Sequence, residues 1–321
     1  MYMFKYILKR LGLMIMTFSI IVLISFVLIK LLPNEPEKIL GKDDGLINAQ
    51  YEARGYNDPI IVQLFNYLKR IVLYGDFGIV VTLPGYTKAA PVWDIFVEKL
   101  PPTVLINVYS TVVAVPIGIA LGIYAALKKN KIQDHVISTG VMLFISVPSF
   151  VYAFLVQYIF CFVLNWFPLT MESGYNYFSW PMFSSMMPAV ISMSFGSIAG
   201  YARGTRAELT EVLTSEFMLL ARTKGLTRGQ ATVRHALRNA MVPIFPSIVG
   251  EFVAVLSGSL IIEKIFGIPG VGGLFLLSIN SMDYDMFMLL SAFYILIGLA
   301  AGIVIDLSYG FIDPRIRMGA K

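Results

Sequence analysis

Long apolar runs constrain this chain more than any other feature of its sequence. An α-helix needs about 20 apolar residues to cross the hydrocarbon of a bilayer. Backbone polar groups in that layer must bond within the protein, which favours helices. Six runs meet the requirement: Leu11–Leu32, Thr103–Leu127, Val136–Leu164, Met182–Tyr201, Val242–Ile262 and Met286–Leu307. The sequence therefore predicts an all-α integral membrane protein with six transmembrane helices.

The composition agrees with this class. Hydrophobic residues make up 57% of the chain and charged residues 14%, whereas soluble domains carry about 25% charged residues. No signal-peptidase site follows the first apolar run, so we expect that run to be retained as a helix. The single cysteine, Cys161, lies within an apolar run. An intrachain disulfide and a metal cage built from cysteines are thereby excluded.

Lysine and arginine beside the apolar runs predict which ends face the cytoplasm. They precede the first run, fill the second connection and close the chain: Lys5, Lys9, Arg10, Lys128, Lys129, Lys131, Arg315, Arg317 and Lys321. Others occupy the connection between the fourth and fifth runs: Arg203, Arg206, Arg222, Lys224, Arg228, Arg234 and Arg238. We therefore expect both termini and this connection in the cytoplasm. Membrane topology also explains the net charge of +5 without nucleic acid.

The expected segments follow from these runs. They are a cytoplasmic N-terminus with the first helix (1–32), an extracytoplasmic segment (33–102), a five-helix core (103–311) and a cytoplasmic tail (312–321). In the second segment, apolar residues at helical spacing predict an amphipathic helix that ends at Gly75. A further amphipathic stretch, Trp93–Leu100, is expected to lie flat at the outer membrane interface and to end before Pro101 and Pro102.

The cytoplasmic loop 202–241 carries a helical pattern of its own. Apolar residues recur every three or four positions and predict one amphipathic helix: Leu209, Val212, Leu213, Phe217, Leu220 and Ala221. Gly225 is expected to end it in a left-handed conformation. Thr227 and Gln230 have the form of a capping box that opens a second short helix through Leu237. Such a pair fits either a groove on a partner protein or an anionic membrane surface, and the pattern alone leaves both open.

Glycines and prolines inside the runs predict how the spans pack. Gly118 and Gly122 are spaced so that another helix can approach closely. Prolines lie within or at the edge of the later runs and predict kinked helices: Pro116, Pro148, Pro188, Pro243 and Pro246.

Several motifs resemble one family of membrane proteins. The runs Phe217–Leu226 and Arg234–Pro243 are similar to the ATPase-coupling motif of the peptide branch of binding-protein-dependent ABC importers. Further matches are Phe4–Leu11, Leu31–Pro33, Glu263–Gly272 and Asp306–Arg317. Together they cover the chain from end to end and resemble the B-type permease subunit of oligopeptide and dipeptide importers.

One departure concerns the motif of importers in general, Glu-Ala-Ala-x-x-x-Gly, which fits only at Ala221 and Gly225. The form found in the peptide branch, Ala-Arg-x-Lys-Gly, fits in full. The resemblance is therefore closer to the peptide branch than to importers of sugars.

The resemblance implies partners and a division of labour. The chain would lie in a bacterial plasma membrane and pair with a C-type permease. Two ATPases that use ATP and Mg²⁺ and an extracytoplasmic peptide-binding protein would complete the importer. The chain itself would be non-catalytic and bind no cofactor or metal. Phe217 and Leu220 would enter the ATPase groove, and Gly225 would form the turn. The implied coupling residues are Glu216, Phe217, Leu220, Ala221, Arg222, Lys224, Gly225, Leu226, Arg234, Arg238, Asn239 and Pro243.

Missing motifs agree with a non-catalytic chain. The sequence contains no Gly-x-x-x-x-Gly-Lys-Ser/Thr loop, which would bind nucleotide phosphates. The two histidines, His135 and His235, have no nucleophile and carboxylate arranged with them inside the membrane runs.

The pathway candidates are one acid and one glycine-rich run. Glu251 is the only acidic residue well inside an apolar run, where a carboxylate either lines a polar path or bonds to another helix. The run Gly267–Gly273 is either a gate near the membrane surface or a tight loop. The candidate lining residues are Glu251, Phe266, Gly267, Pro269 and Gly270.

Two other functions are weighed against the ABC permease. A self-sufficient secondary carrier or channel needs ion-coupling groups near the membrane midplane, and Glu251 alone gives thin support for them. A membrane scaffold for cytoplasmic enzymes explains the predicted helical pair but not a full set of kinked spans.

Overall fold

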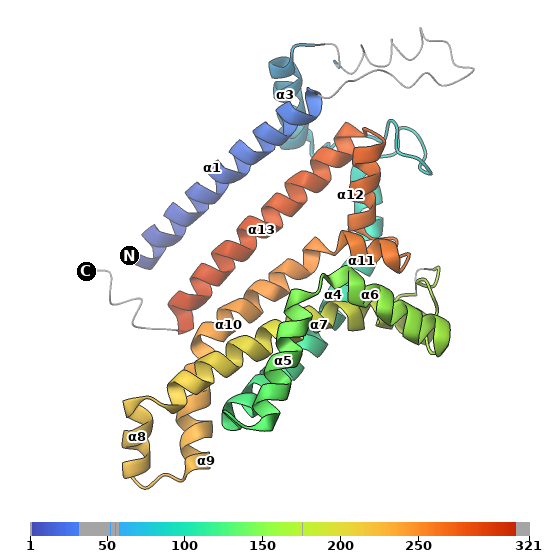
Figure 1. The fold of residues 1–321 in the computed structure, drawn as a ribbon. Helices are drawn as coiled ribbons and strands as arrows, with labels where there is room; N and C mark the ends of the chain where they lie inside the picture. Colours follow the sequence, from blue (N-terminus) through green and yellow to red (C-terminus); the bar gives the residue numbers. More distant parts are fainter. Residues whose placement is uncertain (1, 32–51, 53–54, 56–57, 175, 313–321) are drawn as a thin grey trace. The chain divides into compact units, whose positions relative to one another are not determined.

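The computed structural model describes residues 2–31, 52, 55, 58–174 and 176–312. Among these residues the regular elements are helices, and one isolated antiparallel bridge joins Ile79 and Pro91 (Figure 1). Five helices are long and apolar enough to cross a membrane, and a bent pair makes six if it counts as one span. The all-α membrane class is therefore confirmed. The predicted tail beyond Ile312 and most of residues 32–57 lie outside the described part.

Long helices account for most of the fold. They are α1 (Tyr2–Lys30), α4 (Val92–Leu127), α5 (Ile132–Ser146), α7 (Trp180–Leu213), α10 (Leu237–Ala254) and α13 (Tyr284–Ile312). Shorter helices are α3 (Ile60–Lys69), α6 (Ser149–Val156), α8 (Glu216–Thr223), α9 (Arg228–Ala231), α11 (Leu260–Ile265) and α12 (Val271–Asn280). Wider π-helical turns extend α3 over Arg70–Tyr74 and α6 over Gln157–Val163, and join α9 to α10 over Thr232–Ala236.

The described chain divides into two compact units. One contains Lys99–Leu274 together with both ends of the chain, and the other contains Lys9–Glu98 and Phe275–Leu296.

The second span starts earlier than the sequence predicted. Helix α4 begins at Val92 and continues through Pro101 and Pro102, so Trp93–Leu100 is its first part and not a separate interfacial helix. Phe96 is 2% exposed, and its ring meets the edge of Phe293 at 4.8 Å. Packing of this first part offsets the backbone hydrogen bonds that the two prolines remove. The helix therefore begins before Thr103, the first residue of the predicted span.

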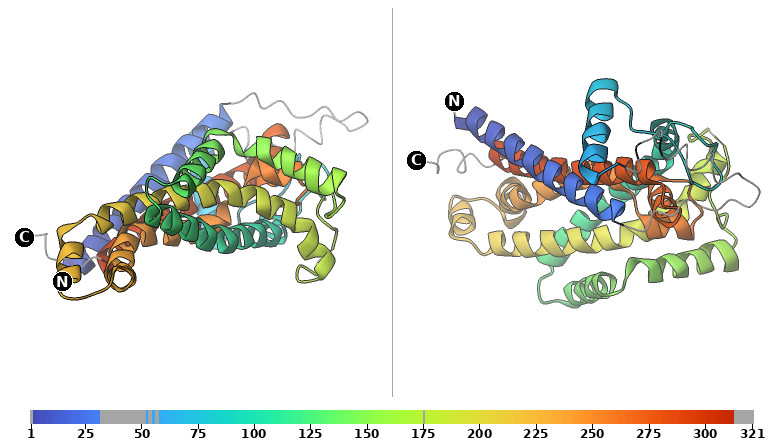
Figure 2. Two further views of the ribbon diagram at one scale, coloured as in Figure 1. Left: turned by 60° about the horizontal axis from the view of Figure 1, so that its bottom comes forward. Right: turned by 90° about the horizontal axis from the view of Figure 1, so that it is seen from above.

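The third span is broken in the middle. Helices α5 and α6 meet at 103°, and Figure 2 shows them in green as two rods joined at a bend. Val147 between them is extended, with φ −88° and ψ 129°. The ring of Pro148 disfavours helical backbone at the preceding residue, which explains the break. The predicted run Val136–Leu164 is therefore two helices.

The fourth and fifth spans extend into the predicted loop 202–241. Helix α7 continues to Leu213, so Arg203 and Arg206 are helical and the connection begins at Thr214. The segment after Thr227 is helical from Arg228 to Ser257, so the predicted second short helix is the start of the fifth span. Gly258, with φ +65°, then separates that span from α11. The predicted span end at Ile262 is wrong for this reason.

Two glycines let α4 lie directly against α7. A Cβ atom at Gly118 would lie 2.8 Å from the Ile198 carbonyl oxygen, and one at Gly122 would lie 2.7 Å from the Ala202 carbonyl oxygen. Any side chain at these positions would push the two backbones apart. The close approach predicted from this glycine pair is thus confirmed as a contact within the chain.

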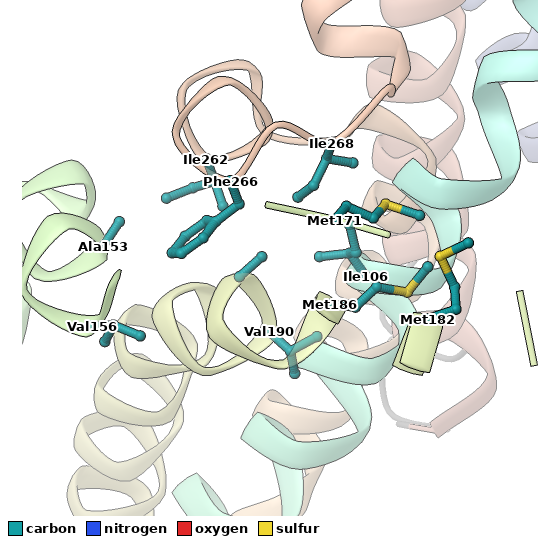
Figure 3. Packing of buried hydrophobic residues seen from close by; sticks show 11 residues of the cluster. Ile106, Ala153, Val156, Met171, Met182, Met186, Val190, Ile262, Phe266 and Ile268 are labelled. Atoms are coloured by element: carbon teal, nitrogen blue, oxygen red, sulfur yellow. The ribbon is translucent and has the colours of Figure 1, made fainter. Parts of the chain in front are cut away.

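A cluster of buried side chains lies within the unit that contains Lys99–Leu274. Figure 3 shows residues from α4, α6, α7 and α11 converging there, among them Ile106, Val156, Met186 and Phe266. Each of these four is less than 5% exposed. Side chains from four helices thereby pack these helices against one another.

The other unit ties the segment after α1 to the start of α13. Asp283 accepts hydrogen bonds from the backbone N–H of Val81 at 2.8 Å and of Thr82 at 3.0 Å. Asp285 accepts from the Arg70 guanidinium at 3.4 Å. The Lys30 ammonium lies 4.6 Å from the centre of the Tyr284 ring. The helix predicted to end at Gly75 is confirmed, since Gly75 has φ +62°.

We expect Gly122→Leu to lower the free energy of unfolding by about 1–3 kcal/mol, because the new side chain overpacks the contact between α4 and α7. The midpoint of thermal unfolding in detergent measures the change. Gly140→Leu is the matched control, since nothing lies within 4 Å of a Cβ atom at that glycine. Equal midpoints for the two variants would contradict the assigned contact.

Candidate functional site

A short helical hairpin links α7 to α10. We call residues 214–231, with α8 and α9, the α8–α9 hairpin; Figure 1 shows it at the adjoining ends of the two long helices. Helix α7 ends at Leu213, where the Thr214 hydroxyl donates to the carbonyls of Thr210 and Glu211. Helix α8 then begins at Glu216. The single helix predicted across Leu209–Ala221 is therefore wrong, because side-chain bonds to the backbone end α7 at this point.

The turn after α8 has the geometry predicted from Gly225. Its φ is +92°, a conformation that a side chain disfavours. The Gly225 N–H donates to the Arg222 carbonyl at 3.0 Å, and the Leu226 N–H donates to the Ala221 carbonyl at 3.4 Å. This is the bond pattern of a Schellman motif, which satisfies the carbonyls at a helix end.

The start of α9 carries the predicted capping box. The Thr227 hydroxyl accepts from the Gln230 N–H at 3.3 Å, and the Gln230 side chain accepts from the Thr227 N–H at 3.1 Å. Local hydrogen bonds therefore fix both sides of the turn.

One face of the hairpin packs against the ends of the long helices. Met218 and Ala221 are buried in a cluster with Ala126 of α4 and Leu209 of α7. Ala231, Ala236 and Ala240 complete this cluster from the other arm. The small side chains let the two arms of the hairpin approach closely.

The opposite face of the hairpin leaves large apolar side chains uncovered. Phe217 is 43% exposed, Leu219 63% and Leu220 55%. Other predicted coupling residues on the surface are Glu216, Arg222, Lys224, Gly225, Arg234, Arg238 and Asn239. Ala221 is buried and Leu226 half-buried. The members of the predicted set from Glu216 to Leu226 thus lie on the hairpin, whereas Arg234, Arg238, Asn239 and Pro243 follow it in the π-helical turn and in α10.

An ion pair joins α5 to α7 near this end of α7. Arg206 donates to both carboxylate oxygens of Asp134, with 2.8 Å between Nη2 and Oδ2. The Asp134 side chain is 1% exposed and also accepts from the Asn130 N–H. Sequence reasoning used Arg206 only as a topological charge and missed its partner. An acid two residues into a helix that follows a lysine-rich turn was the available signal.

A cleft of about 360 Å³ lies between α7 and α10. Its walls are Ser197, Gly200, Tyr201, Gly204, Thr205, Glu208, Pro243, Ile244, Ser247 and Glu251. The Ser197 hydroxyl donates to Glu251 at 2.8 Å, and the Tyr201 hydroxyl donates to the Ser247 carbonyl at 3.2 Å. Glu251 therefore bonds to another helix, as one of the two predictions has it, and it also lines this cleft.

The other pathway candidates lie in a different place. Phe266 is 1% exposed and its ring points into the buried cluster (Figure 3), so it lines no open path here. Gly267 and Pro269 are exposed, whereas Gly270 is buried. None of the four lines the cleft that holds Glu251.

The glycine-rich run is organised by a buried carboxylate that the sequence reasoning did not single out. Glu263 accepts from the Thr103 hydroxyl at 2.9 Å and from the N–H groups of Gly272 at 2.8 Å and Gly273 at 3.2 Å. A Cβ atom at Gly270 would lie 2.5 Å from Glu263 Oε2. Glu263 thus connects α11, α4 and the start of α12, which favours a structural loop over a gate.

Burial raises the pKa of the Glu263 carboxyl, and the hydrogen bonds from Thr103, Gly273 and Gly272 oppose that shift. The signal in the sequence was an acid in an apolar stretch followed by closely spaced glycines, whose N–H groups can approach a carboxylate.

Two family models match this chain. Residues 118–318 match the model described as binding-protein-dependent transport system inner membrane component. Residues 3–107 match the model for the N-terminal part of the membrane component of such systems.

Curated relatives match over almost the whole length. The dipeptide transport system permease protein DppB of Bacillus subtilis is 34% identical over 99% of this chain and 100% of its own. The oligopeptide transport system permease protein OppB of Escherichia coli K12 is 34% identical over 98% of this chain and 100% of its own. A crystal structure of an amino acid ABC transporter with histidines shares the fold, with a TM-score of 0.50 at 19% identity over 67% of this chain and 92% of that one.

We expect Glu263→Ala to lower the free energy of unfolding by about 3 kcal/mol, because it leaves buried N–H and O–H donors without an acceptor. Thermal unfolding in detergent measures the loss. Glu172→Ala, at an exposed carboxylate, is the control and is expected to change the stability by less than about 0.5 kcal/mol. An unchanged midpoint for Glu263→Ala would show that the carboxylate does not stabilise the loop.

Proposed function

The chain belongs to the family of inner membrane components of binding-protein-dependent transport systems, and from this premise we propose that it forms half of the pathway of a peptide importer. Members of this family are permease subunits of ABC importers, which work with separate ATPase subunits and a binding protein in the inner membrane. The chain is therefore a non-catalytic permease subunit, and partner subunits hydrolyse ATP.

The observation that carries the peptide assignment is the similarity over the full length. Relatives named for dipeptide and for oligopeptide transport match this chain from end to end at equal identity. We infer that peptides delivered by the binding protein are the cargo. The B-type identity, a C-type partner and two ATPases complete the proposed assembly, in which ATP and Mg²⁺ bind to the ATPases.

We propose that the α8–α9 hairpin couples the pathway to an ATPase. Three features support this role: it protrudes between two spans, its turn is fixed by local hydrogen bonds, and its outer face exposes Phe217 and Leu220. An apolar side chain that enters a pocket on a partner is a common anchor of a protein interface. The basic residues around it, among them Arg222 and Lys224, would orient an acidic partner surface.

The proposed topology places the hairpin and both termini in the cytoplasm. Arg222, Lys224, Arg228 and Arg234 are exposed on or beside the hairpin, where the positive-inside rule puts such charges. Residues 33 to about 91 then lie outside, as does the loop bound by Glu263. Closure of the ATPases on ATP would draw the two coupling hairpins of a permease pair together, and hydrolysis would reset them.

Purification of the tagged chain from its own bacterium tests the assembly. We expect two ATP-binding subunits and a second permease to co-purify, and the complex in liposomes to take up peptide only with ATP and the binding protein. Uptake by the chain alone, driven by an ion gradient, would show that it is instead a secondary carrier.

We expect Phe217→Asp to reduce ATPase activity stimulated by the binding protein at least about tenfold, because a charge replaces the apolar anchor. The assay is phosphate release by the complex in liposomes, with co-purification of the ATPases as a second readout. Leu219→Asp is the control, since Leu219 is exposed on the same helix but lies on the opposite side of that helix from Phe217. Equal losses in both variants, or none, would contradict the proposed anchor.

A further inference from the structure

We propose that the α7–α10 cleft binds ammonium groups of the cargo as they pass, with Glu251 as the acceptor. This inference rests on the proposed peptide cargo and adds a chemical preference to it. The ammonium belongs to a lysine side chain or to the amino terminus of a peptide. Both groups carry three N–H donors and no acceptor.

Glu251 has acceptor capacity left for such a group. Its Oε1 accepts from Ser197 at 2.8 Å, and no hydrogen bond to Oε2 is present in the described part of the chain. An ionised carboxylate accepts about four hydrogen bonds in all. Ser197 therefore holds the carboxylate of a residue that lines the cleft and leaves Oε2 able to accept from a ligand.

The charges around the cleft have one sign. Glu208 lines it as well, and no lysine or arginine is among the lining residues. At about 1.5 Å per residue, Ser197 and Glu208 lie about 16 Å apart along α7. Arg203 and Arg206, from the same part of α7, line a separate groove between α7 and α5. The cleft thus offers a carboxylate near each end and no basic residue between them.

A hydroxyl in the wall supports a polar occupant. Thr205 is 1% exposed and lines the cleft, and its oxygen is buried without a hydrogen-bond partner in the described residues. A buried hydroxyl of this kind costs free energy unless a ligand or water bonds to it. Thr205 therefore adds a polar side chain to the wall, although its oxygen is itself covered.

A metal ion is a poorer occupant. Within the described residues, no three acidic, histidine or cysteine side chains lie close enough together to hold one. One carboxylate is enough to accept from an ammonium, which carries three N–H donors. Weak binding of this kind also lets the cargo leave again, as transport requires.

The test compares two tripeptides of nearly equal size, alanyl-lysyl-alanine and alanyl-norleucyl-alanine. The full complex in liposomes takes up each one with ATP and the same binding protein, and the measurement is the ratio of the two initial rates. The preference of the binding protein cancels when this ratio is compared between wild type and variant. We expect Glu251→Gln to lower the lysine-to-norleucine ratio about fivefold, the worth of an ion pair of about 1 kcal/mol.

Glu251→Gln keeps an oxygen that can accept from Ser197, so the helix contact is expected to survive. If Glu251→Gln does not assemble, the same lysine-to-norleucine ratio is measured for Glu208→Gln, which removes the other carboxylate of the cleft. Glu211→Gln, at an exposed carboxylate on α7 outside the cleft, is the control and is expected to leave the ratio unchanged.

The outcomes separate this inference from its premise. A lower ratio in the cleft variants but not in Glu211→Gln supports it. Uptake of both peptides at an unchanged ratio in the cleft variants would overturn the ammonium site while the peptide importer stands. Failure of the wild-type complex to take up either peptide would overturn both.

Discussion

Backbone N–H and C=O groups need partners wherever a helix ends, and this constraint shapes several irregular places in the fold. At each of the following places a side chain or a turn satisfies the freed groups. Thr214 bonds to the carbonyls at the end of α7, the Gly225 turn closes α8, and Glu263 accepts the first N–H groups of α12. The segment after α1 follows the same rule, since Asp283 accepts N–H groups of Val81 and Thr82. Polar side chains therefore mark where the chain leaves regular helix.

Local signals in the sequence were sufficient for the class and the hairpin turn. Gly225 and the pair Thr227 and Gln230 act through bonds to neighbours within a few residues, so their geometry could be predicted. Prolines were harder, because their effect depends on packing. Pro101 and Pro102 sit inside a continuous helix, whereas Pro148 follows a break of 103°. The side chains that pack around each proline decide between these outcomes, and the local sequence does not show which side chains those are.

The polar contacts between helices could not be predicted from the sequence for a related reason. Asp134 and Arg206, or Glu263 and Thr103, are distant along the chain and meet only after the spans have packed. The predicted pathway set shows the same limit. Glu251 lines a cleft, whereas Phe266 and Gly270 belong to the packed region around Glu263. An acid in an apolar run was a sound reason to expect a special environment, but the run could not tell which acid faces a cavity and which one is enclosed.

Helix α7 has a mechanical consequence. It is one helix of 34 residues, so it is about 51 Å long, and its middle forms a wall of the cleft while its end carries the hairpin. A tilt of about 10° around that middle displaces the end by about 4 Å. The glycine contact with α4 and the ion pair with α5 lie between the middle and the end, where they hold α7 against its two neighbours. A rigid helix of this length would convert a small tilt at the cleft into a movement of several ångströms at the hairpin. A movement of the hairpin would likewise tilt the helix at the cleft.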